Sequence, residues 1–292
     1  MAATDSAPFT SLIDATTLAQ HLGKPNWVVL DCRHDLAAPA AGRDAYAAGH
    51  IPGARFVSID DDLSDKTPAA DGHFRGRHPL PQRAAFLATL RSWGIDDATQ
   101  VVAYDAAGGM FAARLWWMLR WVGHPAVAVL DGGLPAWVAA AQPLSTASIS
   151  VIPAGAISAR QSLVATVSAA DLVANLAEQK YTVVDARAPD RFRGENETLD
   201  PVGGHIPGAR NRFFKDNLEP DGRFKSAAAL RTGFAGLVDH PATAVMQCGS
   251  GVTACHNLLA LEVAGLPGAA LYPGSWSEWC ANPTRPVAIG SD

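Results

Sequence analysis

Short apolar runs alternate with segments of helical periodicity along the whole chain. In the first half the pattern predicts strands at 27–31, 100–104 and 126–130, and helices at 82–93, 111–121 and 134–140. In the second half it predicts strands at 182–185, 244–247 and 269–271, and helices at 226–237 and 253–264. Asp14 and Ser168 are candidate N-caps of one further helix in each half. Apolar strands alternating with helices indicate an α/β fold, a parallel sheet flanked by helices on both faces.

The two halves of the chain share a seven-residue segment letter for letter. GHIPGAR occupies residues 49–55 and again residues 204–210. The strands that precede it end in Asp31 and Asp185, and the patterns that follow keep the same order. We therefore predict a tandem duplication of one domain. The expected boundaries are a first domain at 1–145, a linker rich in Ser, Ala and Pro at 146–166, and a second domain at 167–292.

Composition narrows the classes of partner. The net charge of −5, without any basic block, argues against nucleic acid, so an anionic ligand has to be met by a local site. No apolar run approaches the roughly 18 residues of a membrane span. Four cysteines, at 32, 248, 255 and 280, are too few and too unevenly spaced for a disulfide framework or a metal site. With no signal-peptide pattern at the N-terminus, we expect a cytoplasmic protein.

The strand at 244–247 runs directly into Cys248, which is followed by a small-residue loop before a helix near Thr253. Gly249 and Gly251 let the loop backbone turn tightly, so that its N–H groups can point inward as a nest for an anion. The positive end of the following helix adds to this effect. Such an environment stabilises a thiolate, which makes Cys248 a candidate nucleophile. The alternative is a buried cysteine that only packs.

The corresponding loop of the first half carries Asp105 where the second half carries Cys248. In an open α/β sheet, ligands bind beyond the carboxyl ends of the strands, so both loops lie where a site belongs. Only one of them has a thiol, which predicts one catalytic and one inactive, supporting domain. Phosphatase chemistry needs an arginine six residues after the cysteine to clamp phosphate, and Ala254 stands there instead.

Four motifs together resemble the two-domain sulfurtransferases of the rhodanese type. They are the duplicated GHIPGA, the DAR at 185–187, the loop CGSGVTA at 248–254 and YPGSWSEW at 272–279. The resemblance spans nearly the whole chain, and the loop looks like that of the mercaptopyruvate-using branch. Thiosulfate is a dianion that would gain from a cation in the loop, whereas mercaptopyruvate carries its charge on a carboxylate remote from the sulfur. The uncharged Gly249, Ser250 and Gly251 therefore favour mercaptopyruvate.

The resemblance implies a double-displacement mechanism. Cys248 attacks the sulfur of the donor, pyruvate leaves as its enolate, and a persulfide forms on the cysteine. Backbone amides of the loop would stabilise it, and the residues in question are Gly249, Gly251, Val252 and Thr253. A thioredoxin-like dithiol, glutathione or cyanide would accept the outer sulfur, and no cofactor is implied.

Further site residues follow only from the resemblance. It places a carboxylate-binding arginine after the DAR strand, where this chain has Arg191. The second arginine that the family carries in the next segment has no counterpart in residues 195–201, and Arg193 would lie on the opposite side of an extended segment. Thiosulfate therefore stays as an alternative donor. A non-catalytic rhodanese-type binding or sulfur-relay module is the alternative from another class.

The resemblance also suggests a proton relay to the loop serine, Ser250. The matching residues are His78 and Asp61, with Asp60 or Asp62 able to serve in place of Asp61. Such a relay could polarise the carbonyl of the donor or protonate the departing enolate.

Two other groups have simpler interpretations. His50 and His205 occur in both copies of the repeat, including the copy without a thiol, which favours a structural role. Ser275, Trp276 and Trp279 follow a strand that ends beside the cysteine loop, so we expect them at the rim of the site.

Overall fold

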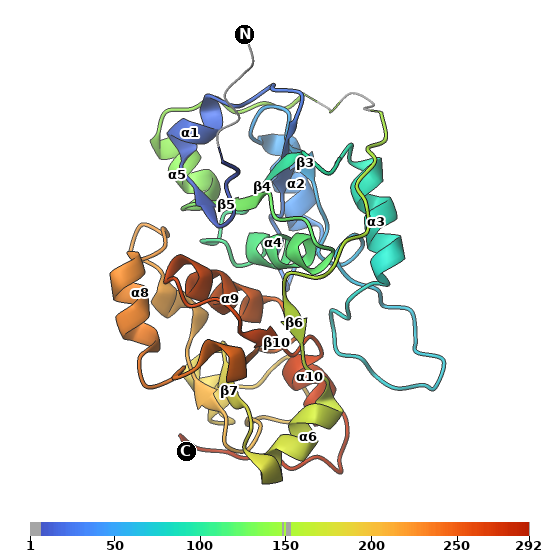
Figure 1. Ribbon diagram of the computed structural model, residues 1–292, viewed down its shortest axis with the longest axis vertical. Coiled ribbons are helices and arrows are strands. Elements are labelled where there is room, and N and C mark those ends of the chain that lie inside the picture. Colours follow the sequence, from blue (N-terminus) through green and yellow to red (C-terminus); the bar gives the residue numbers. More distant parts are fainter. Residues whose placement is uncertain (1–6, 148, 150–152, 292) are drawn as a thin grey trace. The chain divides into compact units, whose positions relative to one another are not determined.

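The computed structural model describes residues 7–147, 149 and 153–291 of the chain. Residues 1–6 of the N-terminal segment, and residues 148 and 150–152 of the expected linker, lie outside the described residues. The chain divides into two compact units, one made of residues 1–57 and 83–163 and the other of residues 58–82 and 164–292 (Figure 1). The segment 58–82, which the sequence analysis assigns to the first domain, thus packs with the second unit.

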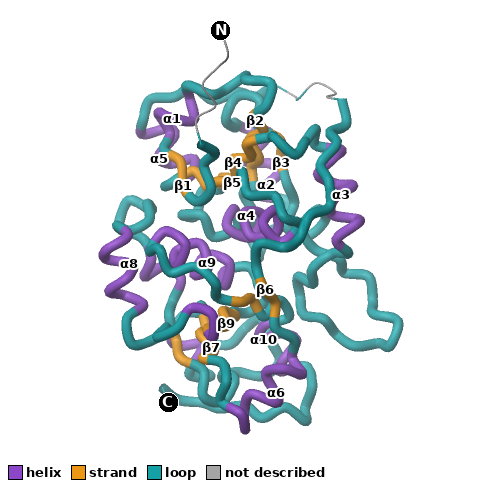
Figure 2. Tube along the Cα trace, viewed as in Figure 1, coloured by secondary structure: helices purple, strands orange, loops and turns teal. Residues whose placement is uncertain are grey.

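The first unit is built on a parallel sheet of five strands in the order β1-β5-β4-β2-β3. The strands are β1 Leu12–Ile13, β2 Trp27–Asp31, β3 Arg55–Phe56, β4 Gln100–Tyr104 and β5 Val127–Leu130. The helices around them are α1 Ala15–Ala19, α2 Ala41–Ala48, α3 Arg83–Ser92, α4 Ala112–Trp121 and α5 Gly133–Ala139 (Figure 2).

The second unit repeats the same topology, with the order β6-β10-β9-β7-β8. Its strands are β6 Ala165–Thr166, β7 Thr182–Asp185, β8 Arg210–Asn211, β9 Ala244–Gln247 and β10 Ala270–Leu271. Its helices are α6 Ala169–Glu178, α7 Pro189–Phe192, α8 Ala227–Phe234, α9 Thr253–Val263 and α10 Ser275–Cys280, with 3₁₀ turns η1 Phe214–Asn217 and η2 Pro241–Thr243. The equal strand order confirms the predicted α/β fold and its duplication.

Local signals account for the elements that the sequence predicts. The side chain of Asp14 accepts the Thr17 N–H at 2.8 Å and begins α1. Ser168 and Asp171 form a reciprocal capping box at the start of α6. The central strands β4 and β9 are buried along their whole length, as their apolar runs predict, and the burial includes the glutamine at one end of each strand. The edge strands β1, β3, β6 and β8 were not predicted, because two residues carry no periodicity.

The repeated GHIPGAR segment is held in the same way in both units. Asp31 and Asp185 each bind the arginine two residues further on, at 2.7 Å. The guanidinium groups of Arg33 and Arg187 donate in turn to the carbonyl of the first glycine of the repeat. The histidine of each copy is buried, with Nδ1 2.8 Å from a backbone carbonyl oxygen. The shared sequence therefore encodes a shared buried turn, in keeping with a structural role.

The loop after β4 surrounds a negatively charged side chain with backbone N–H groups. The buried carboxylate of Asp105 accepts four backbone N–H groups at 2.8–3.0 Å, from Ala107, Gly109, Phe111 and Ala112. The last of these lies at the start of α4. Peptide donors that converge near a helix N-terminus form an anion site. In the first unit the protein fills this site with its own side chain.

Replacing this carboxylate should destabilise the first unit. In the Asp105→Asn variant an amide NH₂ would face backbone N–H donors, so two of them would lose their acceptor. We expect the free energy of unfolding to fall by about 2–4 kcal/mol. Asp35→Asn is the matched control, because Asp35 also accepts two backbone N–H groups but is exposed. Urea denaturation of both variants checks this, and equal midpoints would contradict it.

Candidate active site

Cys248 lies between the central strand β9 and helix α9, and its side chain is buried, with 2% of the residue exposed. The loop around it depends on glycine. Gly251 has a φ of +77°, and a Cβ atom there would overlap the carbonyl oxygen of Pro273. A residue with a side chain would therefore be strained and would displace the loop. The small residues after the cysteine are a steric requirement of this close approach.

Helix α10 holds the backbone of the cysteine loop. The Cys248 N–H donates to Ser275 Oγ at 3.1 Å. The N–H groups of Trp276 and Ser277 donate to the carbonyls of Cys248 and Gly249, both at 2.9 Å. The first turn of α10 thus uses its free donors on the loop, which positions the nucleophile candidate.

Ser275 adopts an unusual backbone conformation to make its contact. Its φ is +52°, whereas the matching residue of the first unit is Gly133 at +58°. A non-glycine residue in this region costs about 1–3 kcal/mol. The second unit carries this strain and gains a hydroxyl that accepts from Cys248 and donates to the Tyr272 carbonyl at 2.9 Å.

The two tryptophans expected at the rim of the site are core residues. Trp276 and Trp279 are fully buried. Their indole N–H groups donate to the carbonyls of Val202 and Pro286, at 2.8 and 2.9 Å. The expectation is wrong for these two side chains because α10 turns them away from the loop and into the sheet. Of the three residues, Ser275 is the one whose side chain forms a hydrogen bond with Cys248 in the described part of the chain.

Four amides of the cysteine loop have no acceptor among the described residues. In the described chain, the N–H groups of Gly249, Ser250, Val252 and Thr253 donate to no backbone or side-chain oxygen. Helix α9 also begins without a side-chain cap. This contrasts with the first unit, where Asp105 takes four such donors. The second unit thus keeps the anion site and leaves it open to a negative charge at Cys248.

Ser250 is paired with His78, as the sequence analysis predicts for a relay. His78 Nδ1 lies 2.7 Å from Ser250 Oγ, and both residues are buried. The segment 58–82 packs with the second unit, so this pair lies within one compact unit. The hydroxyl can therefore pass a proton to or from the imidazole.

The carboxylate beside His78 is Asp60, not Asp61. Asp60 Oδ1 lies 3.4 Å from His78 Nε2. Asp61 is exposed, its N–H donates to Ser58 Oγ at 3.1 Å, and its side chain forms no ion pair with His78 in the described residues. The turn that begins at Ser58 directs Asp61 to solvent. The choice of Asp61 within the acidic triplet is therefore corrected to Asp60, which was one of the alternatives.

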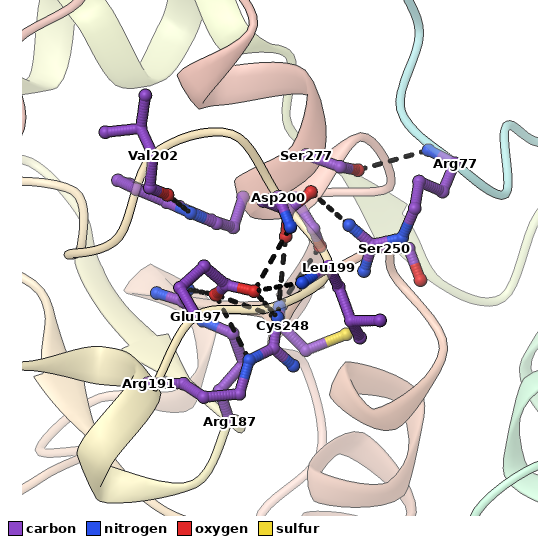
Figure 3. A network of polar contacts seen from close by, with 12 residues as sticks. Arg77, Arg187, Arg191, Glu197, Leu199, Asp200, Val202, Cys248, Ser250 and Ser277 are labelled. Atoms are coloured by element: carbon purple, nitrogen blue, oxygen red, sulfur yellow. Dashed lines mark hydrogen bonds and ion pairs between the residues drawn. The ribbon is translucent and has the colours of Figure 1, made fainter. Parts of the chain in front are cut away.

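Arginines and carboxylates form a network next to Cys248 (Figure 3). Arg191 binds Glu197 through Nε at 3.1 Å and Nη2 at 2.8 Å, and reaches Asp200 at 3.5 Å. Arg77 forms an ion pair with the same Asp200. Burial raises the pKa of Glu197, but hydrogen bonds from Arg191 and from backbone N–H groups lower it below its usual value. Glu197 is therefore an anion that orients Arg191.

Arg187 brings a buried positive charge near Cys248. Its side chain is 1% exposed and pairs with Asp185 at 2.7 Å and with Glu197 at 3.5 Å. Burial lowers the pKa of Arg187, but the negative charges of Asp185, Glu197 and Cys248 together raise it above its ordinary value. The guanidinium also stacks over Trp276, with Cζ 4.8 Å from the ring centroid.

The sequence analysis missed several members of this network. They are Arg77, Arg187, Glu197 and Asp200. Arg187 was seen only as part of the repeated strand end. A signal for Arg77 was present, since it directly precedes the relay candidate His78 in the chain.

This arrangement, a thiol in the loop between a central strand and a helix of a parallel α/β sheet, has a counterpart among known protein families. A family model described as "Rhodanese-like domain" matches residues 14–140 and 168–282, so the chain belongs to that family. The described residues contain no helix long and apolar enough to cross a membrane.

Individual relatives cover nearly the entire chain. A probable 3-mercaptopyruvate sulfurtransferase of Pseudomonas aeruginosa is 47% identical over 96% of this chain and 98% of its own length. A putative thiosulfate sulfurtransferase of Mycobacterium tuberculosis is 42% identical, over 90% and 91% of the two chains. The crystal structure of a 3-mercaptopyruvate sulfurtransferase from Escherichia coli matches with a TM-score of 0.79 and 32% identity, over 92% of this chain and all of that one.

The relay geometry predicts different effects for neighbouring aspartates. In Asp60→Asn the imidazole of His78 loses its anionic neighbour, so proton transfer through Ser250 should slow and turnover in sulfur transfer should fall about tenfold. Asp61→Asn, the control next to it in the chain, should keep full turnover because its side chain is exposed. Steady-state assays of both variants test the assignment. Loss of turnover in Asp61→Asn alone would restore the original choice.

Proposed function

We propose that this protein is a sulfurtransferase that takes sulfur from 3-mercaptopyruvate and carries it as a persulfide on Cys248. The observation that carries the proposal is the open anion site around the thiol. At the same place in the first unit a carboxylate satisfies the loop amides, whereas in the second unit those of Gly249, Ser250, Val252 and Thr253 have no acceptor from the described chain. The relatives named above support the choice of reaction.

The first half-reaction moves one sulfur atom. The thiolate of Cys248 attacks the sulfur of the donor, the new S–S bond forms and the carbon–sulfur bond breaks. The electron pair of that bond leaves with the three-carbon fragment, which departs as the enolate of pyruvate. The proton of the donor thiol is lost from the new persulfide, and the enolate carbon gains one proton. The products are pyruvate and a Cys248 persulfide anion, so charge and atoms balance.

The side chains around the loop have separate tasks in this step. The Ser250 hydroxyl, hydrogen-bonded to His78, is placed to polarise the ketone of the donor and to supply a proton to the enolate. Arg191 binds the carboxylate of the donor. The amides of Gly249, Gly251, Val252 and Thr253 stabilise the negative sulfur before and after transfer. Donors that are fixed in advance need no reorganisation when the charge shifts between the two sulfur atoms.

The second half-reaction returns the enzyme to its thiolate. An acceptor thiolate or cyanide attacks the outer sulfur, and the S–S bond breaks with its electron pair on Cys248. We propose a thioredoxin-like dithiol, glutathione or cyanide as acceptor. All four cysteines are free thiols, and the reaction needs Cys248 reduced, so we assign the activity to a reducing compartment such as the cytoplasm.

Thiosulfate is the second candidate donor. The guanidinium groups of Arg77 and Arg191 lie beside the loop and could attract a dianion, and a relative with 42% identity is a putative thiosulfate sulfurtransferase. The uncharged side chains of the loop itself favour mercaptopyruvate, because no cation in the loop meets a sulfonate bound directly to the transferred sulfur.

Mass spectrometry tests the central claim. After incubation with 3-mercaptopyruvate without an acceptor, the peptide that contains Cys248 should gain about 32 Da, the mass of one sulfur. Cys248→Ser should lose both the gain and turnover, whereas Cys280→Ser should keep them because Cys280 lies on α10 and faces the core. Sulfur gain from thiosulfate alone would favour the second candidate donor. No gain with any donor would leave a non-catalytic binding module.

A further inference from the structure

Gln247 carries a buried amide whose two polar atoms lack partners among the described residues. It is the last residue of β9, directly before Cys248, and it is fully buried. Neither its Oε1 nor its Nε2 forms a hydrogen bond with another described residue. Because an unpaired buried amide is costly, nearly all such groups in folded proteins have a partner from the chain or from bound water. The side chain of Gln247 therefore points to a ligand.

The first unit has Tyr104 at the matching place. Tyr104 lies opposite Asp31 in the register of β4 and β2, and Gln247 lies opposite Asp185 in the register of β9 and β7. The two units have the same strand order, so the two side chains leave equivalent positions of equivalent strands. Val245, two residues before Gln247 and hence on the same face of β9, belongs to the core of the second unit. Gln247 thus points into that core.

The hydroxyl of Tyr104 joins two groups of the first unit. It donates to Asp31 Oδ2 at 2.6 Å and accepts the N–H of Ile51 at 3.2 Å. Asp31 ends the strand before the GHIPGAR segment, and Ile51 belongs to that segment. A single oxygen atom therefore satisfies a buried carboxylate and a buried peptide N–H at once.

The second unit keeps both of these groups and lacks the hydroxyl. Asp185 and Ile206 are the matching residues of the second copy. Within the described chain, Asp185 Oδ2 accepts only from the guanidinium of Arg187, and the N–H of Ile206 has no acceptor. The glutamine side chain is shorter than that of tyrosine, so its amide ends before the position of the hydroxyl. The carboxylate, the N–H and the amide then surround one position for a small polar ligand.

We propose that the second unit binds one structural water molecule at the position that the tyrosine hydroxyl occupies in the first unit. This water accepts the N–H of Ile206, donates to Asp185 Oδ2 and exchanges one hydrogen bond with the amide of Gln247. Three hydrogen bonds to otherwise unpaired groups are typical of a buried water. Its role is structural, because it completes the contacts of the carboxylate that holds Arg187. The inference goes beyond the proposed function and does not depend on sulfur transfer.

A high-resolution crystal structure of the full chain tests the site directly. We expect a water within about 3.2 Å of Asp185 Oδ2, of the Ile206 nitrogen and of one amide atom of Gln247. Direct contact of the amide with Asp185 or Ile206 would overturn the proposal, because the glutamine itself would then replace the hydroxyl. Apolar side-chain atoms at that position would overturn it as well.

Exchange of the two residues between the units gives a second test. Tyr104→Gln should add one long-lived internal water, and Gln247→Tyr should remove one, as counted by oxygen-17 magnetic relaxation dispersion. Met246→Leu is the matched control, since Met246 is the buried apolar neighbour of Gln247 and lies on the other face of β9, and its count should equal that of the unaltered protein. Unchanged counts in the exchanged variants would contradict the proposal. If the larger tyrosine prevents folding, Tyr104→Gln and the crystal structure still decide.

Discussion

The structure depends on one electrostatic constraint, the set of peptide N–H groups that converge where a central strand turns into a helix. Donors that converge in this way demand a negative charge, because buried N–H groups without an acceptor are costly. The first unit meets the demand internally, with the carboxylate of Asp105. The second unit has Cys248 in place of that carboxylate. The negative charge that the N–H groups require then has to come from the sulfur. In the proposed reaction a thiolate and a persulfide anion at Cys248 would both satisfy it, so the feature that stabilises one copy would serve the chemistry of the other.

Keeping such a site open requires support from outside the loop. In the second unit the support comes from α10, whose first turn holds the backbone of Cys248 and Gly249. The segment 58–82 adds His78 and Arg77 to the same loop. The network of Glu197 and Asp200 holds the arginines without neutralising every donor. Each of these groups is fixed before a ligand arrives, which is the condition for electrostatic stabilisation of a transition state.

The parts that could be predicted from sequence are those in which local pattern and fold agree. Asp14 and Ser168 cap helices by contacts within four residues, and the strands ending at Tyr104 and Gln247 are apolar except for one glutamine at an end of each, so both kinds of element are visible in the chain. Three consecutive aspartates cannot be told apart in this way, because the turn after Ser58 decides which side chain meets His78. Residues 58–82 belong to the second unit because of their tertiary packing. The hydrophobic periodicity of the sequence does not reveal this packing.

The two copies of the domain differ in backbone strain at the turn next to the loop that carries Asp105 or Cys248. At the turn that contacts the nucleophile loop, the first unit has Gly133, which adopts its left-handed conformation without penalty, and the second has Ser275, which does not. A glycine at position 275 would adopt this conformation without strain but would leave the Cys248 N–H without the Ser275 hydroxyl. The strain at Ser275 is offset only where its hydroxyl accepts a hydrogen bond from the N–H of Cys248. The strained residue and the candidate nucleophile therefore occur in the same copy. The comparison of the two units therefore separates what the fold needs, which both copies keep, from what the sulfur chemistry needs, which only the second copy carries.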